Sequence, residues 1–195
     1  LDRETSGVLL LARGRDAARR LAGAFAHGLV EKSYRAIAVD PGTVHPTGSS
    51  GCIDVPLGFD HDSEHFAGLK IGRGTWAART HYRCLARVGE LAELEVRIEG
   101  GRQHQIRVHL AMLGTPLLGD KLYGRPDAFY KDFLEGRAST AELGAERHAL
   151  HAFQLRFREG DEDFAIEAPL PPDFASWLAA RGSATASPVE VVDGS

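Results

Sequence analysis

Cysteine and long apolar runs are scarce in this chain of 195 residues. Only Cys52 and Cys84 occur, far apart and in no paired metal-ligand spacing, which argues against a disulfide-rich scaffold and a cysteine-based zinc site. We expect both to be small buried side chains in a cytoplasmic protein, where thiols stay reduced. No apolar run approaches the roughly 20 residues that a membrane-spanning helix needs, so we expect no membrane partner.

Basic residues are not in excess either, because 23 lysines and arginines face 27 aspartates and glutamates, for a formal net charge of -4. Proteins that coat polyanions without regard to sequence usually carry a basic excess, so this class is disfavoured. A nucleic-acid enzyme with a focused basic cleft stays possible. With 43% hydrophobic residues and no internal repeat, the chain predicts a single core over residues 1–181, with a loose polar tail over 182–195 and a monomeric state.

One stretch departs from the acidic total, because residues 100–119 hold two arginines and two histidines and no acidic side chain. A glycine pair at its start permits a tight turn. Residues 104–113 then carry apolar side chains at helical spacing, and Gly114 suits the left-handed position that ends a helix. These apolar residues are Ile106, Leu110 and Leu113. The pattern predicts a turn followed by a helix. The unpaired backbone N–H groups at the N-terminus of such a helix can bind phosphate.

The rest of the chain predicts more strands than helices. The expected strands cover residues 8–12, 31–39, 52–55, 75–88, 90–98, 148–157 and 164–168. The expected helices cover residues 16–28 and 127–134, with a last short helix that carries Phe174, Trp177 and Leu178. Since helices and strands do not alternate regularly, we expect an α+β fold, with a mixed, mostly antiparallel sheet and flanking helices.

Six short motifs are spread along the chain. They are Leu1-Asp2-Arg3-Glu4-Thr5-Ser6-Gly7, Lys32-Ser33-Tyr34, Gly101-Arg102-Gln103-His104-Gln105-Ile106-Arg107-Val108-His109-Leu110, Gly119-Asp120-Lys121-Leu122-Tyr123-Gly124, Leu150-His151-Ala152 and Ala168-Pro169-Leu170-Pro171. In this order the chain resembles RluA-type pseudouridine synthases from residue 1 to about residue 174. The resemblance implies that selected uridines of ribosomal or transfer RNA become pseudouridine, the base being detached at N1, turned in the pocket and rejoined to the ribose through C5. It also implies RNA as the partner, and neither a metal nor an organic cofactor.

By this resemblance Asp2 is the catalytic carboxylate, Arg107 is the arginine paired with it, and Tyr34 is the aromatic residue beside the flipped base. An adjacent guanidinium favours the ionised form of a carboxylate in a water-poor pocket. Whether Asp2 attacks the sugar or removes a sugar proton stays open. A base must leave its stack to be turned, and an aromatic face can hold it. Assistance by the Tyr34 hydroxyl in removing the C5 proton is a second role that stays open. Contacts with RNA or with the pocket are expected from Arg102, Gln103, His104 and Leu150.

Several alternatives accompany this interpretation. Leu150 is also consistent with an ordinary core position, and Asp120 is expected to tie a loop. His104 and His109 point apart on one helix, which favours structural hydrogen bonds over a metal pair. Family members usually carry His-Arg directly before the Leu-Asp pair, so we expect an N-terminally truncated catalytic domain. A non-catalytic RNA-binding module of the same fold is the alternative function.

Overall fold

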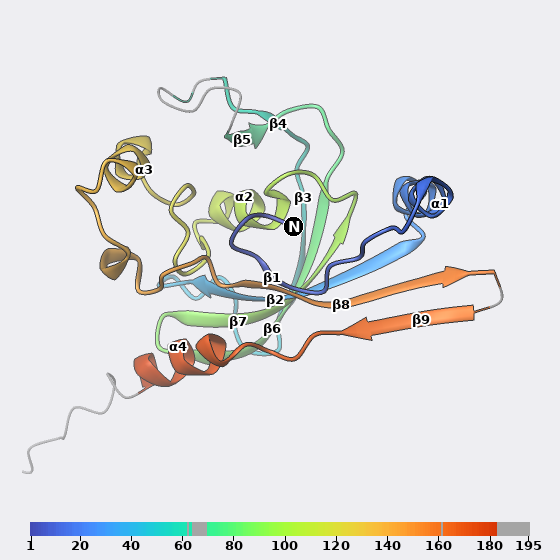
Figure 1. The fold of residues 1–195 in the computed structure, drawn as a ribbon. Helices are drawn as coiled ribbons and strands as arrows, with labels where there is room; N and C mark the ends of the chain where they lie inside the picture. Colours follow the sequence, from blue (N-terminus) through green and yellow to red (C-terminus); the bar gives the residue numbers. More distant parts are fainter. Residues whose placement is uncertain (62, 64–69, 161, 183–195) are drawn as a thin grey trace, which may run out of the picture.

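The computed structural model describes residues 1–61, 63, 70–160 and 162–182. Its centre is a seven-stranded sheet in the order β1-β8-β2-β7-β6-β3, with β9 pairing to β8 (Figure 1). The strands are β1 Ser6–Gly7, β2 Val30–Val39, β3 Ser50–Asp54, β6 Arg79–Val88, β7 Leu91–Glu99, β8 Leu150–Glu159 and β9 Glu162–Glu167. Every pairing in this sheet is antiparallel except that of β1 with β8. The predicted mixed, mostly antiparallel sheet is therefore confirmed.

Two helices lie on opposite faces of this sheet, α2 Gln105–Met112 on one and α4 Pro172–Gly182 on the other (Figure 1). Successive side chains of a strand point to opposite faces, so β2 serves both layers. Ala36 and Ala38 join the core cluster under α2, whereas Ile37 joins the cluster under α4. The α4 cluster includes the residues expected on the last helix, Phe174, Trp177 and Leu178.

The remaining elements lie around the sheet. Helix α1 spans Arg15–Ala26, helix α3 spans Asp127–Leu134 and a 3-10 turn spans Thr140–Leu143. A small hairpin consists of β4 Leu57–Phe59 and β5 Ile71–Arg73. Helix α3 has the predicted bounds. Within the described ranges, no helix is long and apolar enough to cross a membrane.

The path from β6 to α2 follows the sequence pattern. Gly89, with φ at 58°, forms the turn between β6 and β7, and β7 ends directly before the glycine pair. Gly100 and Gly101 have φ angles of 94° and 102°, a region that L-residues with side chains rarely adopt. Gly114, at φ 75°, ends α2 with its N–H donating to the Ala111 carbonyl at 2.9 Å. The predicted turn, hairpin and helix are confirmed.

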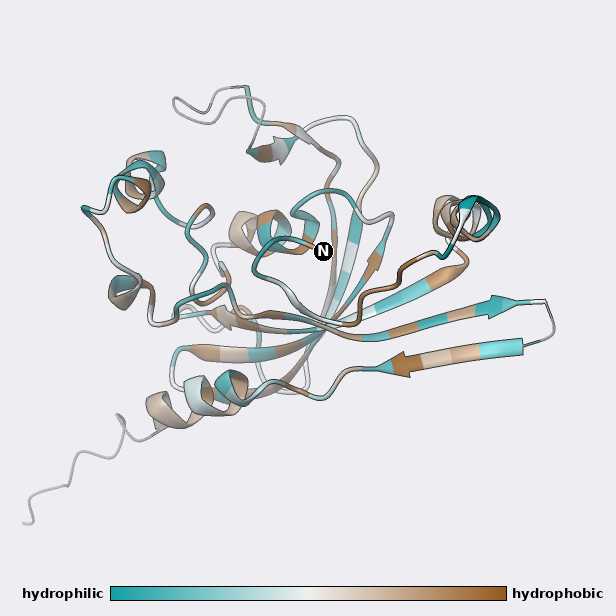
Figure 2. Cartoon of the chain, in the orientation of Figure 1, coloured by the Kyte–Doolittle hydropathy of each residue, from teal (hydrophilic) through white to brown (hydrophobic). Residues whose placement is uncertain are grey.

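The strand expected over residues 8–12 is wrong. Strand β1 ends at Gly7, and Leu9 and Leu11 are 62% and 77% exposed. The free edge of β8 limits β1, because His151 and Ala152 pair with β1 whereas β9 pairs with the same edge from Gln154 onward. The chain therefore leaves the sheet as an apolar segment that runs to α1 (Figure 2).

Cys52 also departs from expectation, because it is exposed whereas Cys84 is buried. Strand β3 lies at the edge of the sheet and buries Ile53, so its neighbour Cys52 points outward. Most of the tail expected over residues 182–195 lies outside the described residues.

Candidate active site

A cavity of about 570 Å³ lies where the N-terminal turn, β2, the loop before α2 and β8 meet. Its lining includes all seven residues that the sequence predicted for the site. These are Asp2, Tyr34, Arg102, Gln103, His104, Arg107 and Leu150. They come from segments separated by up to about 150 positions in the chain, so the fold brings the predicted site residues together.

Arg107 lies at the centre of a line of charges in this cavity. Its Nη1 donates to the Asp2 carboxylate at 3.1 Å, while Nε and Nη2 donate to the two oxygens of Asp120 at 2.7 and 2.9 Å. The Asp120 side chain is fully buried and that of Arg107 is 8% exposed, whereas Asp2 keeps 20% of its side chain accessible. Asp120 therefore fixes the guanidinium from behind, and Asp2 presents its carboxylate to the cavity.

Burial alone would disfavour the charges on both members of the inner pair. For Arg107 this effect is outweighed by the hydrogen bonds and negative charges of Asp120 and Asp2, and the pKa of Arg107 is raised. For Asp120 burial is outweighed by the hydrogen bond and charge of Arg107 and by the backbone N–H groups of Leu122 and Tyr123, and the pKa of Asp120 is lowered. Both groups are thus ionised at neutral pH.

The turn that carries Asp2 is attached to the body of the protein by three side chains that follow it. Glu4 accepts a bond from the buried Lys121 ammonium at 2.5 Å. Thr5 Oγ1 lies 2.9 Å from His148 Nε2, and Ser6 Oγ lies 2.9 Å from His151 Nδ1. Because these partners belong to the Asp120 loop and to β8 and its approach, the turn is positioned relative to both.

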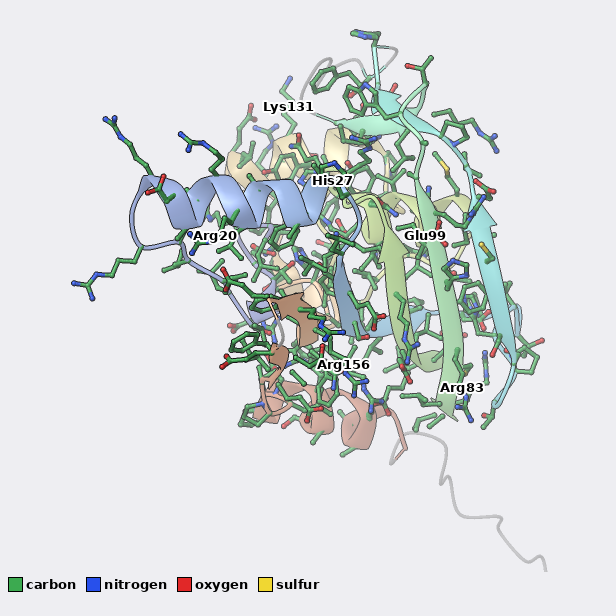
Figure 3. The ribbon with its side chains drawn as sticks, turned by 90° about the vertical axis from the view of Figure 1, so that its right-hand side faces the viewer. Arg20, His27, Arg83, Glu99, Lys131 and Arg156 are labelled. Carbon is green, nitrogen blue, oxygen red and sulfur yellow. The ribbon has the colours of Figure 1, made fainter. Side chains whose placement is uncertain are left out.

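The loop before α2 is held by the buried amide of Gln105. Its Oε1 accepts the backbone N–H groups of Gly101 and Arg102, at 3.1 and 2.9 Å. Its Nε2 donates to the carbonyls of Arg79 and Glu99 and to Thr80 Oγ1. One side chain thereby connects the glycine turn to the first residue of β6 and the last residue of β7, which is the Glu99 labelled in Figure 3.

Tyr34 and Lys32 form the wall on the β2 side. Burial, followed by the negative charge of Asp2, raises the pKa of Tyr34 to about 12, so its hydroxyl keeps its proton at neutral pH. Lys32 Nζ donates to the Gly100 carbonyl at 3.0 Å, and burial lowers the pKa of this ammonium. Leu150 is 4% exposed and belongs to the α2 core cluster, so it is at once a core residue and part of the cavity wall.

The two histidines of α2 and its N-cap have different partners, as predicted. His104 Nδ1 lies 2.8 Å from the Tyr123 hydroxyl, whereas His109 is buried between Thr80 Oγ1 and the Val55 carbonyl. Among the described residues, no three histidine, cysteine or acidic side chains gather as a metal site.

Three residues of the site received no role in it from the sequence, namely Gln105, Asp120 and Tyr123. Asp120 does tie its loop, accepting the N–H groups of Leu122 and Tyr123 at 2.9 and 3.0 Å. Its pairing with Arg107 is not local in sequence, so no periodicity indicates it. The available signal was the position of Asp120 as the first acidic residue after a stretch that contains only basic charges.

The chain is similar to known RNA pseudouridine synthases. The family model described as RNA pseudouridylate synthase matches residues 1–112. The chain is 37% identical, over 176 residues, to a protein of Zymomonas mobilis subsp. mobilis named ribosomal large subunit pseudouridine synthase D, covering 89% of the chain and 52% of that relative. It is 44% identical, over 178 residues, to an uncharacterized RNA pseudouridine synthase of Chloroflexus aurantiacus, covering 89% of the chain and 49% of the relative.

Solved structures agree with these sequence matches. Human RNA pseudouridylate synthase domain containing 4 superposes with a TM-score of 0.70 at 26% identity, covering 94% of this chain and 74% of that one. Human RNA pseudouridylate synthase domain containing 1, at 24% identity, shares the fold with a TM-score of 0.69 and covers 91% of this chain and 70% of that one. The chain spans about half the length of the curated relatives it matches.

Proposed function

Because the chain belongs to the RNA pseudouridylate synthase family, we propose that the protein converts uridine to pseudouridine in ribosomal RNA, with Asp2 as the catalytic carboxylate. The observation that carries the proposal is the position of Asp2. Its carboxylate lines a cavity of about 570 Å³ and is paired with the Arg107 guanidinium at 3.1 Å. Ribosomal RNA is favoured over transfer RNA because several relatives are named ribosomal large subunit pseudouridine synthase D.

The reaction is an isomerisation that balances without a redox partner. The bond between N1 of the base and C1′ of the ribose breaks, a bond between C5 and C1′ forms, C5 loses its hydrogen and N1 gains one. Asp2 acts at the sugar, by attack or by removal of a proton, and either route requires an ionised carboxylate. Arg107 supplies the adjacent positive charge, and Asp120 directs it by accepting from the other two nitrogens of the guanidinium, Nε and Nη2.

We assign Tyr34 to holding the base outside the RNA stack. A phenol with a pKa of about 12 carries its proton at neutral pH and is a poor proton acceptor, whereas its ring offers a stacking face. Leu150 contributes an apolar wall to the same space. Removal of the C5 proton is therefore not assigned to Tyr34.

Contacts with the RNA backbone are assigned to the positive groups at the loop before α2. Arg102 and Lys32 both line the cavity, and Arg102 Nε is anchored on the Ala77 carbonyl at 3.2 Å. Phosphate contacts of this kind set position and not sequence. Gln103 and His104 complete this side of the cavity. A cytoplasmic location, a monomeric state and the absence of a cofactor remain predictions.

Pseudouridine mapping across total RNA tests the proposal. RNA from cells with and without the gene is compared at single-nucleotide resolution, and the gene is then restored. We expect one or more sites in ribosomal RNA to lose pseudouridine and to regain it on complementation. Loss at a transfer-RNA site would correct the substrate class, and an unchanged map would contradict the proposed function.

A further inference from the structure

His104 stands out in the cavity because its backbone is in the left-handed region. Its φ is 55° and its ψ is 16°, at the N-cap of α2, a conformation that non-glycine residues seldom adopt. Backbone strain of this kind persists where the surrounding structure enforces it, and it is often found at functional sites. The imidazole lines the cavity beside Arg107 and meets the Tyr123 ring edge to face at 5.6 Å.

The hydroxyl of Tyr123 decides which nitrogen of His104 carries a proton. Tyr123 is 4% exposed, and its Oη accepts the backbone N–H of Ile71 at 3.0 Å. The same oxygen lies 2.8 Å from His104 Nδ1. Over the described part of the chain, no atom other than His104 Nδ1 lies within hydrogen-bond reach to accept from this hydroxyl, so a proton on Nδ1 would leave the buried O–H without an acceptor. The Tyr123 O–H therefore donates to His104 Nδ1.

The remaining ring proton of His104 is then on Nε2. Burial, followed by the positive charge of Arg107, lowers the pKa of His104, so the ring is neutral at neutral pH. A neutral imidazole that accepts at Nδ1 donates at Nε2. No other described residue bonds Nε2, and the ring lines the cavity, so this donor is available to a bound base.

We propose that His104 is a specificity-determining residue, whose Nε2–H donates to a carbonyl oxygen of the flipped uracil. The inference rests on the proposed function. In uracil, O2 and O4 lie symmetrically about N3, and a half-turn about the N3–C6 axis exchanges N1 with C5 and O2 with O4. A single fixed donor thus meets a carbonyl oxygen both before and after the base turns.

This arrangement discriminates against cytosine. Cytosine carries an amino donor at C4 in place of a carbonyl oxygen, so in one of its two orientations a donor would face the His104 donor. A pocket that hydrogen-bonds its substrate rejects a base that leaves a polar group of the pocket unpaired, because an unpaired buried donor costs free energy. His104 accordingly selects for a base with acceptors on both sides of N3, and the Tyr123 hydroxyl is the positioning group that fixes its tautomer.

Nitrogen-15 NMR of the histidine side chains tests the tautomer without reference to activity. We expect His104 to show protonated Nε2 and unprotonated Nδ1. The chain provides two references, because the backbone carbonyls bonded to His109 Nε2 and His27 Nδ1 require a proton on those nitrogens. Tyr123→Phe should remove the preference of His104 for the tautomer that carries its proton on Nε2. A protonated Nδ1 on His104 in the unmodified protein would overturn the inference.

Sulfur-substituted RNA tests the contact with the base, using the full-length protein. Thiocarbonyl sulfur accepts hydrogen bonds more weakly than oxygen, so wild-type kcat/KM should fall about tenfold more than that of His104→Gly when the target uridine is replaced by 4-thiouridine. Gly is chosen because it adopts the left-handed backbone and carries no side-chain donor. Asp54→Asn, at a side chain that is 60% exposed and outside the cavity lining, is the control, and its ratio of kcat/KM for uridine to kcat/KM for 4-thiouridine should equal that of wild type.

The possible results separate the two proposals. If wild-type protein converts neither RNA, the proposed function fails. If it converts uridine and the ratio is the same for wild type and His104→Gly, the proposed function stands and the role of His104 is wrong. A ratio that changes equally in Asp54→Asn would also contradict that role, because the effect would then not be specific to His104.

Discussion

Asp120 is the residue whose loss should affect this protein most widely, and Asp120→Asn is the sharpest test of the charge arrangement. The wild-type carboxylate accepts four N–H groups, two from Arg107 and one each from the backbone of Leu122 and Tyr123. An asparagine has one oxygen and an amide that cannot accept, so the amide would face an N–H donor of the guanidinium. Arg107 would keep only Asp2 as a carboxylate partner.

The size of the effect follows from burial. Removing one partner of a buried ion pair costs about 3–5 kcal/mol, and since Asp2 partly compensates, we expect a loss of about 3 kcal/mol in the free energy of unfolding. The turnover rate should also fall, by about 10- to 100-fold, because the guanidinium is no longer held in one orientation beside Asp2.

Urea denaturation at pH 7 measures the stability, with Asp54→Asn as the matched control. Asp54 pairs with Arg79 at 2.7 Å, but both side chains are about half exposed or more, at 60% and 44%. Exposed pairs contribute about 0–1 kcal/mol, so the control should remain close to the wild-type midpoint. Equal and small losses in the two variants would refute the reasoning that Asp120 neutralises a buried charge.

Three further predictions concern other parts of the site. Burial, followed by the charge of Arg107, lowers the pKa of His148 to about 4 from an ordinary value of 6.5, so the unfolded chain binds the extra proton first. The unfolding free energy should therefore fall by up to about 3 kcal/mol as the pH drops from 6.5 to 4. Denaturation curves measured at several pH values should show that His148→Gln lacks this part of the pH dependence. The same pH dependence of the unfolding free energy in wild type and His148→Gln would contradict the prediction. Gln105→Ala should lower the unfolding free energy by about 2–4 kcal/mol, because it removes the several hydrogen bonds by which a buried amide pairs partly buried backbone groups. A thermal midpoint equal to that of wild type would contradict the role of this amide. If Tyr34 holds the base with its ring, as we propose, Tyr34→Phe should keep most of the turnover rate whereas Tyr34→Ala should lose it. Equal losses for the two variants in single-turnover assays would argue for a role of the hydroxyl.

Much of the fold followed from local patterns. The alternation in residues 90–98, the turn at Gly89 and the helical spacing over residues 104–113 each depend on near neighbours in the chain, and the structure confirms them. The family resemblance carried by the six motifs is also confirmed. The strand expected over residues 8–12 failed because its end is decided by a distant competitor, β9, for the edge of β8.

In the site, too, residues within sequence motifs were predicted, whereas contacts between distant parts of the chain were not. Sequence motifs identified Asp2 and Arg107, and the structure places their charged atoms 3.1 Å apart. Asp120, which pairs with Arg107, and Gln105, which holds the loop before α2, act through contacts that depend on the assembled loop and sheet, so no spacing in the sequence predicts their bonds. His104 was expected to contact RNA or shape the pocket, but the direction of its donor follows only from the bonds of Tyr123.

In the proposed function the carboxylate of Asp2 performs the chemistry, and release of the C5 hydrogen measures that chemistry. Full-length protein with Asp2→Asn is incubated with ribosomal RNA labelled with tritium at C5 of uridine, and release of the label is followed. We expect release to fall to the uncatalysed background while RNA binding is retained, because Arg107 still has Asp120 as its partner. Release at the wild-type rate would contradict it.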